Sequence, residues 1–223
     1  MLTRLDKLVF EFDYLFPELE NTYPPPRTRT LLPVLTELRF RGTSEYLEDF
    51  VARIDAPLLD DFLITFLYHS ISDTTQIAQF IGRTPNFEEY YHAKVVFSTF
   101  DTSIIFLEES IRLELRVLGG QPDVQLSSLV QVCTSFFPRD LIATLKRLYI
   151  LSYDRNDYQP YDDIEISRWL DLLRPFIDVW RLYIHSEFVP YILLALQQLV
   201  GQRVTEVLPA LSILFFGNPG KGR

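Results

Sequence analysis

The sequence contains little cysteine and no excess of positive charge. Its single cysteine, Cys133, excludes an internal disulfide. We interpret it as a small buried side chain, with a reactive thiol as the alternative. One cysteine in a chain of this length fits a reducing, intracellular compartment. The net charge of −9 argues against general nucleic-acid binding and against an anionic membrane surface, because both need a basic footprint.

Long apolar runs are also missing. The most apolar stretch, 188–200, contains Pro190 and two glutamines and is shorter than the roughly 20 residues of a membrane-spanning helix. The first residues of the sequence carry charges where the apolar core of a signal peptide would lie. We therefore expect no membrane segment and no targeting signal, and we interpret 188–200 as a buried helix.

Motifs for catalysis or metal binding are not evident. His69, His92 and His185 are far apart and match no metal-ligand spacing. The acidic run 154–163 lacks the central glycine and terminal glutamate of a calcium loop. The pair Gly119-Gly120 is not followed by the lysine and serine of a phosphate loop. The sequence thus predicts no catalytic residue, no cofactor and no metal, and an enzyme with a scattered site is our third hypothesis.

What the sequence does contain is a repeated apolar triad. An apolar residue is followed after two positions by a second, and after one more by a third. Because the last two lie two residues apart, they point to the same face of a short strand. The copies are Leu5/Leu8/Phe10, Leu35/Leu38/Phe40, Leu59/Phe62/Ile64, Tyr90/Ala93/Val95, an incomplete Ser110/Leu113/Leu115, Leu145/Leu148/Ile150, Val179/Leu182/Ile184 and Leu211/Leu214/Phe216.

Helical patterns separate most of these strands. Apolar residues recur at helical spacing over 44–54, 73–81, 125–136, 164–176 and 190–207. Strands and helices that alternate in this way predict an α/β fold, a leucine-rich-repeat-like right-handed solenoid over 1–223. A mostly parallel sheet is expected on the concave side and helices on the convex side. The later repeats recur at roughly 34 residues, longer than the usual 20–29.

Two stretches interrupt the pattern. Residues 21–30 contain Pro24-Pro25-Pro26, which favours an extended return loop in place of a helix. Residues 93–117 contain three extended runs with no room for a helix between them, and 100–102 is typical of a hairpin turn. An antiparallel insertion is therefore expected near residues 93–117.

The repeats resemble a known family. The runs that carry the likeness are LLPVLTELRFRG at 31–42, SEYLED at 44–49, IDAPLLD at 54–60, AQFI at 78–81, VVF at 95–97 and VTEVLPAL at 204–211. They look like the repeat region of the fungal F-box and leucine-rich-repeat proteins of mushroom-forming basidiomycetes, over essentially the whole chain. The resemblance implies the target-recognition region of a cullin-based ubiquitin ligase subunit, in which an F-box docks the adaptor.

The sequence departs from that family in one respect. Repeat-type sequence begins within the first ten residues and the sequence stops soon after the last strand pattern, so we expect neither an F-box nor a capping helix in it. We expect a single repeat domain, a fragment without F-box and cap, with ligase components as partners if an F-box is supplied elsewhere. A ribonuclease-inhibitor-like structural or inhibitory solenoid, unrelated to ubiquitination, is the alternative function.

Candidate binding residues are the outward positions of the strands. Stacking of equivalent positions predicts three ladders on the concave face: Arg112, Arg147, Arg181; Glu114, Tyr149, Tyr183; and Arg116, Leu151, His185. Arginine and tyrosine are enriched where proteins bind each other. The other interpretation is that these side chains only solvate the sheet, with Glu114 neutralising the arginines beside it. The sequence does not identify the protein target.

Overall fold

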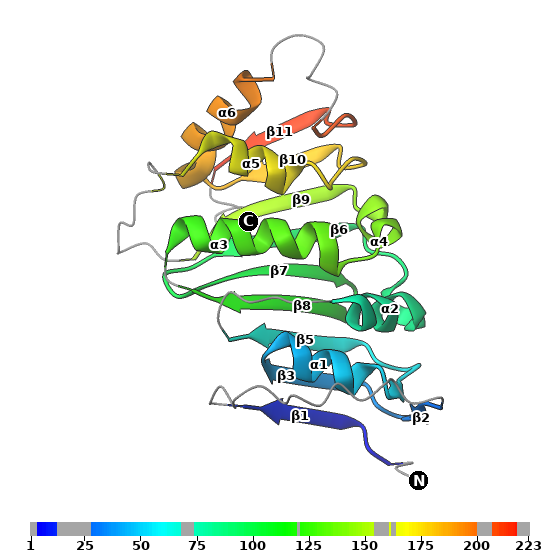
Figure 1. The fold of residues 1–223 in the computed structure, drawn as a ribbon. Coiled ribbons are helices and arrows are strands. Elements are labelled where there is room, and N and C mark those ends of the chain that lie inside the picture. Colours follow the sequence, from blue (N-terminus) through cyan, green and yellow to red (C-terminus); the bar gives the residue numbers. More distant parts are fainter. Residues whose placement is uncertain are drawn as a thin grey trace.

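The computed structural model describes residues 4–12, 28–67, 74–119, 121–153, 161, 164–199 and 207–217. Within these ranges the fold is a mixed α/β arrangement with a large, mostly parallel sheet that does not close into a barrel (Figure 1). In spatial order its strands are β1 (Lys7–Glu11), β3 (Glu37–Gly42), β5 (Asp61–Phe66), β8 (Ile111–Leu118), β7 (Asp101–Glu108), β6 (His92–Phe97), β9 (Arg147–Ser152), β10 (Arg181–Ile184) and β11 (Ile213–Phe216). A separate parallel pair joins β2 (Thr30–Leu31) to β4 (Ile54–Asp55).

The apolar triads have the geometry that their spacing predicts. The second and third members lie in register across the sheet, as in Leu38↔Phe62 and Leu148↔Leu182. In five of the triads the first member closes a turn before the strand, because its N–H donates to the carbonyl three residues earlier. These bonds begin at the N–H of Leu35, Leu59, Leu145, Val179 and Leu211. The repeated sequence pattern is thus accompanied by a repeated turn hydrogen bond in the structure.

The predicted antiparallel insertion is present, with its strands within two residues of the expected limits. β7 pairs antiparallel with both β6 and β8, and β7 alone among the described strands of the sheet runs against the others. Its place in the sheet was not foreseen: β5 pairs with β8, and β9 with β6. The expected hairpin turn at 100–102 lies slightly earlier, where Ser98 N–H donates to the carbonyl of Asp101 at 2.9 Å.

This strand order determines which charged residues are neighbours. It places Asp61 directly opposite Arg112. The order that follows the chain would instead place Arg112 beside Arg147. The expectation that the strand at 112–115 lies next to the strand at 147–150 is therefore wrong, because β7 and β6 lie between them.

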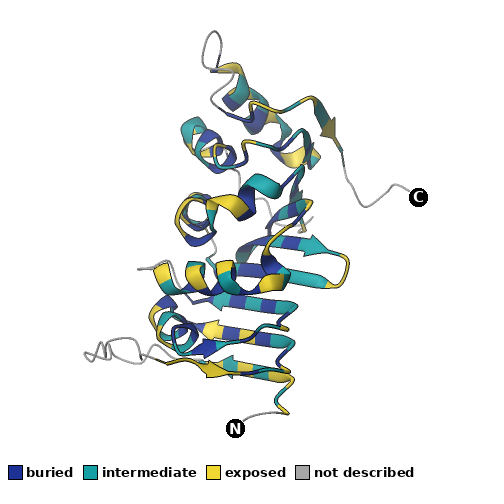
Figure 2. Ribbon diagram, turned by 90° about the vertical axis from the view of Figure 1, so that its right-hand side faces the viewer, coloured by how far each residue is buried: buried dark blue, intermediate teal, exposed yellow. Residues whose placement is uncertain are grey.

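All described helices lie on one face of the sheet, and the other face is free of helices (Figures 1 and 2). They are α1 (Ser44–Val51), α2 (Thr75–Arg83), η1 (Pro85–Phe87), α3 (Pro122–Gln131), η2 (Val132–Phe136), α4 (Arg139–Thr144), α5 (Ile166–Leu173), η4 (Ser186–Phe188) and α6 (Val189–Gln197). The core between sheet and helices contains the triads together with large aromatic side chains such as Trp169, Phe97 and Phe188.

The helices differ from the predictions mainly at their ends. The helix expected over 125–136 begins at Pro122 and continues from Val132 as a π-helical segment. α4, which follows Pro138, was not predicted, because six residues are too few for a clear periodicity. The proline-rich return at 24–26, the acidic run 154–157 with Asp162-Asp163, and His69 lie outside the described residues.

Candidate interaction surface

The helix-free face of the sheet displays three rows of outward side chains. They follow from the strand register, in which alternate residues point away from the helices. The first row is Lys7, Glu37, Asp61, Arg112, Leu107, His92, Arg147, Arg181 and Ile213; the second is Val9, Arg39, Leu63, Glu114, Ile105, Lys94, Tyr149, Tyr183 and Phe215; the third is Glu11, Arg41, Thr65, Arg116, Ser103, Val96 and Leu151.

The predicted ladders are split into two groups by this register. Arg147 pairs with Arg181, and Tyr149 with Tyr183, as expected. Arg112, Glu114 and Arg116 do not continue these rows as neighbours, because β7 and β6 lie between β8 and β9. The sequence likeness of RLEL at 112–115 to RLYI at 147–150 suggested adjacency, but β8 belongs to the antiparallel insertion and pairs with β5 instead. The three continuous ladders were thus a wrong prediction.

We call the outward residues of β1, β3, β5 and β8 the charged half. Its central group is Glu114, whose residue is only 2% exposed although it lies on the helix-free face. The carboxylate of Glu114 accepts hydrogen bonds from Arg112 and, at 2.8 Å, from Arg116. Arg116 also lies 3.8 Å from Asp101. Glu114 therefore neutralises the two arginines beside it.

The same half contains two carboxylates in contrasting environments. Glu37 forms ion pairs with Lys7, at 3.0 Å, and with Arg39. The hydrogen bond from Lys7 is the main reason that the pKa of Glu37 is lowered. Burial raises the pKa of Asp61, and the charge of Arg112 offsets only part of that effect. Most charges on this half thus have an opposite charge as a neighbour.

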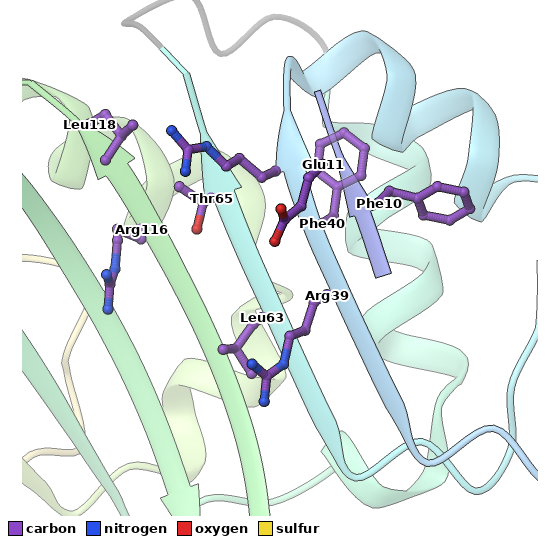
Figure 3. A pocket seen from close by; sticks show the side chains of 9 residues that line it. Phe10, Glu11, Arg39, Phe40, Leu63, Thr65, Arg116 and Leu118 are labelled. Carbon is purple, nitrogen blue, oxygen red and sulfur yellow. The ribbon is translucent and has the colours of Figure 1, made fainter. Parts of the chain in front are cut away.

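A hollow of about 240 Å³ opens on the charged half between β1, β3, β5 and β8. Figure 3 shows Glu11, Arg39, Leu63, Thr65 and Arg116 around it. Arg41 also lines the hollow and has no ion-pair partner among the described residues. The lining contains no histidine, cysteine or serine, so it offers no nucleophile paired with a histidine base.

We call the outward residues of β6, β9, β10 and β11 the aromatic half. Tyr149, Tyr183 and Phe215 form a continuous stack across β9, β10 and β11. The ring centroids lie 4.4 Å apart for Tyr149 and Tyr183, and 4.5 Å apart for Tyr183 and Phe215, with interplanar angles of 9° and 6°. The stack ends in Phe215, which is 43% exposed. Its side chains are therefore held in one orientation while they remain open to solvent.

Cations surround this stack. Lys94 lies beside Tyr149 in the second row, and Arg147 and Arg181 lie beside each other in the first. Arg147 is held over the Tyr91 ring at 4.9 Å, and Arg181 over the Trp180 ring at 4.1 Å. None of the three cations forms an ion pair within the described part of the chain, and no outward position of the described aromatic half is a carboxylate.

Two histidines lie on or next to the aromatic half. The His92 ring meets the Tyr149 ring edge-on at 6.3 Å. Burial lowers the pKa of His92, and the charges of Lys94 and Arg147 add to this while Glu108 opposes it. His185 follows β10, and its Nδ1 accepts a hydrogen bond from Glu187 N–H at 3.4 Å, which caps the short helix η4. His185 thus has a local structural contact, besides its predicted role in binding.

The thiol of Cys133 is isolated from solvent. Cys133 is buried, and burial raises the pKa of its thiol to about 12. Over the described ranges no group of histidine, cysteine and acidic side chains could hold a metal ion. Within the same ranges, no helix is long and apolar enough to cross a membrane.

Sequence reasoning missed Phe215 and the outward residues of β6, which include Lys94 and His92. The signal for Phe215 was present, because Leu214-Phe215-Phe216 repeats the spacing of Leu182-Tyr183-Ile184. Lys94 and His92 were not foreseen because they lie in β6, and nothing local indicates that β6 pairs with β9.

Comparison of the chain with family models, with curated proteins and with solved structures finds no match.

Proposed function

We propose that this chain is a non-enzymatic protein-binding scaffold that contacts its partner through the aromatic half. The observation that carries the proposal is the Tyr149–Tyr183–Phe215 stack with its adjacent cations. Tyrosine and arginine are the residue types that contribute most strongly to protein interfaces. The charged half has the properties of a solvated surface, because most of its charges are neutralised by neighbours.

The geometry of the stack favours binding. Association costs free energy when exposed side chains lose rotamer freedom. Parallel rings at 4.4 and 4.5 Å already restrict one another before a partner arrives. The phenol of Tyr149 has its pKa raised, mainly by burial, so it stays neutral and can donate a hydrogen bond. A partner therefore meets an apolar surface that also offers polar groups and that needs little reordering.

The proposal extends to architecture and context. On either side of β6–β8 the parallel strands, preceded by recurrent turns, support a leucine-rich-repeat-like solenoid whose concave side is the helix-free face. The resemblance to fungal F-box and leucine-rich-repeat proteins supports a role inside the cell as the target-recognition region of a ubiquitin ligase subunit. The bound target is then the protein to be modified.

The test is quantitative affinity capture with matched variants. Tyr149→Ala/Tyr183→Ala removes the stack, and Arg39→Ala/Leu63→Ala changes the same outward row on the charged half. Tyr149→Phe/Tyr183→Phe keeps the stacked rings without their hydroxyls. We expect capture of specific partners to fall by roughly 30-fold, which is 2 kcal/mol at a strong interface residue, in the alanine pair only. Circular dichroism and thermal unfolding establish that each variant is folded.

The outcomes separate the functions. Partners that are unchanged in a folded Tyr149→Ala/Tyr183→Ala variant would refute binding through the aromatic half. Specific partners that include ligase adaptors or cullin support the ligase context. One stoichiometric enzyme with no adaptor would instead indicate the ribonuclease-inhibitor-like alternative.

A further inference from the structure

The cations of the aromatic half form a cluster that has no carboxylate ion-pair partner among the described residues. Arg147 and Arg181 are directly opposite each other on adjacent strands, which lie about 4.8 Å apart. Lys94 is opposite Tyr149 and so diagonal to Arg147, at about 7–8 Å between backbones. Arg147 therefore lies, by backbone spacing, within about one screening length at physiological salt of each of the other two cations. It is the central charge of the cluster.

Acidic groups near the cluster are engaged elsewhere or lie at its border. Glu108 accepts a hydrogen bond from Tyr91 N–H at 3.0 Å. Asp178 lies 3.7 Å from Lys146, and Glu187 lies 3.9 Å from His185. By contrast, Arg112 and Arg116 on the charged half share the buried carboxylate of Glu114. Within the described part of the chain, arginine is thus paired with a carboxylate on one half and has no such partner on the other.

The whole chain has a net charge of −9, so this cluster is a local exception to a negative molecule. Like charges that face each other across strands cost stability. An anionic group bound between them removes that cost, and complementary charge also speeds the approach of a partner. Beside the cluster the stack offers apolar area, which a purely ionic ligand would leave exposed.

We infer that the aromatic half binds an acidic segment of a partner protein, with carboxylates against Lys94, Arg147 and Arg181 and apolar side chains on the Tyr149–Tyr183–Phe215 stack. This inference rests on the proposed function and specifies the chemistry of the partner at the same site. A nucleic acid would also bring negative charge. The acidic protein segment is favoured because the cluster is small and the protein is otherwise acidic, so a long polyanion would be repelled beyond the cluster.

The first test uses a short peptide of alternating glutamate and leucine residues as the probe, with binding followed by the fluorescence of Trp180, which lies against Arg181. Arg147→Glu and Lys94→Glu each reverse one charge of the cluster. Arg41→Glu is the matched control, since Arg41 is an exposed arginine on the charged half without an ion pair among the described residues. We expect at least a tenfold loss of affinity in the first two and less than a twofold change in the control. Added salt should weaken binding to the wild type.

Arg147→Gln is the control for misfolding of Arg147→Glu, because it removes the positive charge without introducing a negative one. Single-stranded DNA of matched charge is the second probe. The inference is overturned if Arg41→Glu weakens binding of the acidic peptide as much as Arg147→Glu, if wild-type protein does not bind this peptide at low salt, or if DNA binds more tightly and is lost in the same variants.

Affinity capture separates this inference from the proposed function. If specific partners are lost in Tyr149→Ala/Tyr183→Ala and retained in the two charge-reversal variants, the aromatic half binds protein without the acidic segment, and only the further inference fails. If those partners are retained in all variants, the proposed function fails as well. Loss in both kinds of variant, with retention in Arg41→Glu, supports both.

Discussion

The two halves of the helix-free face share one sheet and one register but differ in how their side chains are satisfied. On the charged half, arginine and lysine lie next to carboxylates, and Glu114 is buried between two arginines. On the aromatic half, three rings stack on one another. Lys94, Arg147 and Arg181 have no carboxylate partner among the described residues. The comparison shows that outward-facing residues of one sheet can differ in their interactions. The useful distinction is whether a charged side chain already has an oppositely charged neighbour within the protein.

The largest expected effect on stability comes from Glu114. We expect Glu114→Ala to lower the free energy of unfolding by about 2–3 kcal/mol, because Arg112 and Arg116 lose their shared counter-charge. The value is below that of a fully buried pair, since both arginines are partly exposed. Chemical denaturation measures it, and Glu114→Gln, which keeps the shape, serves as the control. Partner capture by the folded variant should be unchanged; if it falls, the charged half also contributes to binding.

The next effect distinguishes the middle of the stack from its end. Tyr183 contacts rings on both sides, whereas Phe215 contacts one. Each aromatic pair contributes about 0.5–1.5 kcal/mol. We expect Tyr183→Ala to destabilise the protein by about 1–2 kcal/mol and Phe215→Ala by about half as much in the same denaturation assay. Equal losses would mean that the rings act singly and that the stack has no role as a unit.

The halves should also respond to acid in different pH ranges. The pKa of His92 is lowered by burial, so the unfolded chain takes up the proton first as pH falls. Stability is therefore lost as pH drops below the ordinary histidine pKa of about 6.5. We expect His92→Gln to abolish this loss in unfolding curves recorded between neutral pH and the carboxylate range. A wild-type-like loss in the variant would assign it to another group.

At lower pH the carboxylates of the charged half should act in opposite directions. The pKa of Asp61 is raised, so its ionisation costs stability as pH rises through the carboxylate range. The pKa of Glu37 is lowered, so its contribution is gained over the same rise. Unfolding curves should therefore show Asp61→Asn improving relative to the wild type with rising pH, and Glu37→Gln worsening. Identical trends would contradict the two environments.

The smallest expected effect is at the margin of the charged half. Lys7 lies at an edge strand and is half exposed, although its Nζ is 3.0 Å from Glu37. Exposed ion pairs contribute about 0.2–1 kcal/mol. We expect Lys7→Ala to cost no more than that at low salt and nearly nothing at high salt, as measured by thermal unfolding. A larger, salt-independent loss would show that the pair is structural.

The sequence was sufficient for local structure and insufficient for part of the strand order. The triads predicted which residues are buried, because the alternation of strand side chains is a local property; Leu38, Phe62 and Leu148 are fully buried. The three runs of 93–117 predicted the antiparallel insertion for the same reason. Which insertion strand meets Arg147 depends on residues far apart in the chain, so His92 rather than Arg112 occupies that place. The stack was half predicted, since Tyr149 and Tyr183 lie in consecutive repeats.

The reversed order of β6, β7 and β8 also limits how such a protein can be assembled. In a simple array each unit adds to the one before it, so the chain can grow from one end. Here the connection from β5 to β6 skips the positions of β8 and β7, and the connection from β8 to β9 skips those of β7 and β6. The flanking groups join the three-stranded meander through β5–β8 and β6–β9, and both pairings join strands that are far apart in sequence. Folding should therefore pass through closure of the middle, where contacts distant in sequence are concentrated, and a unit added or deleted by duplication would be tolerated on either side of the meander but not within it.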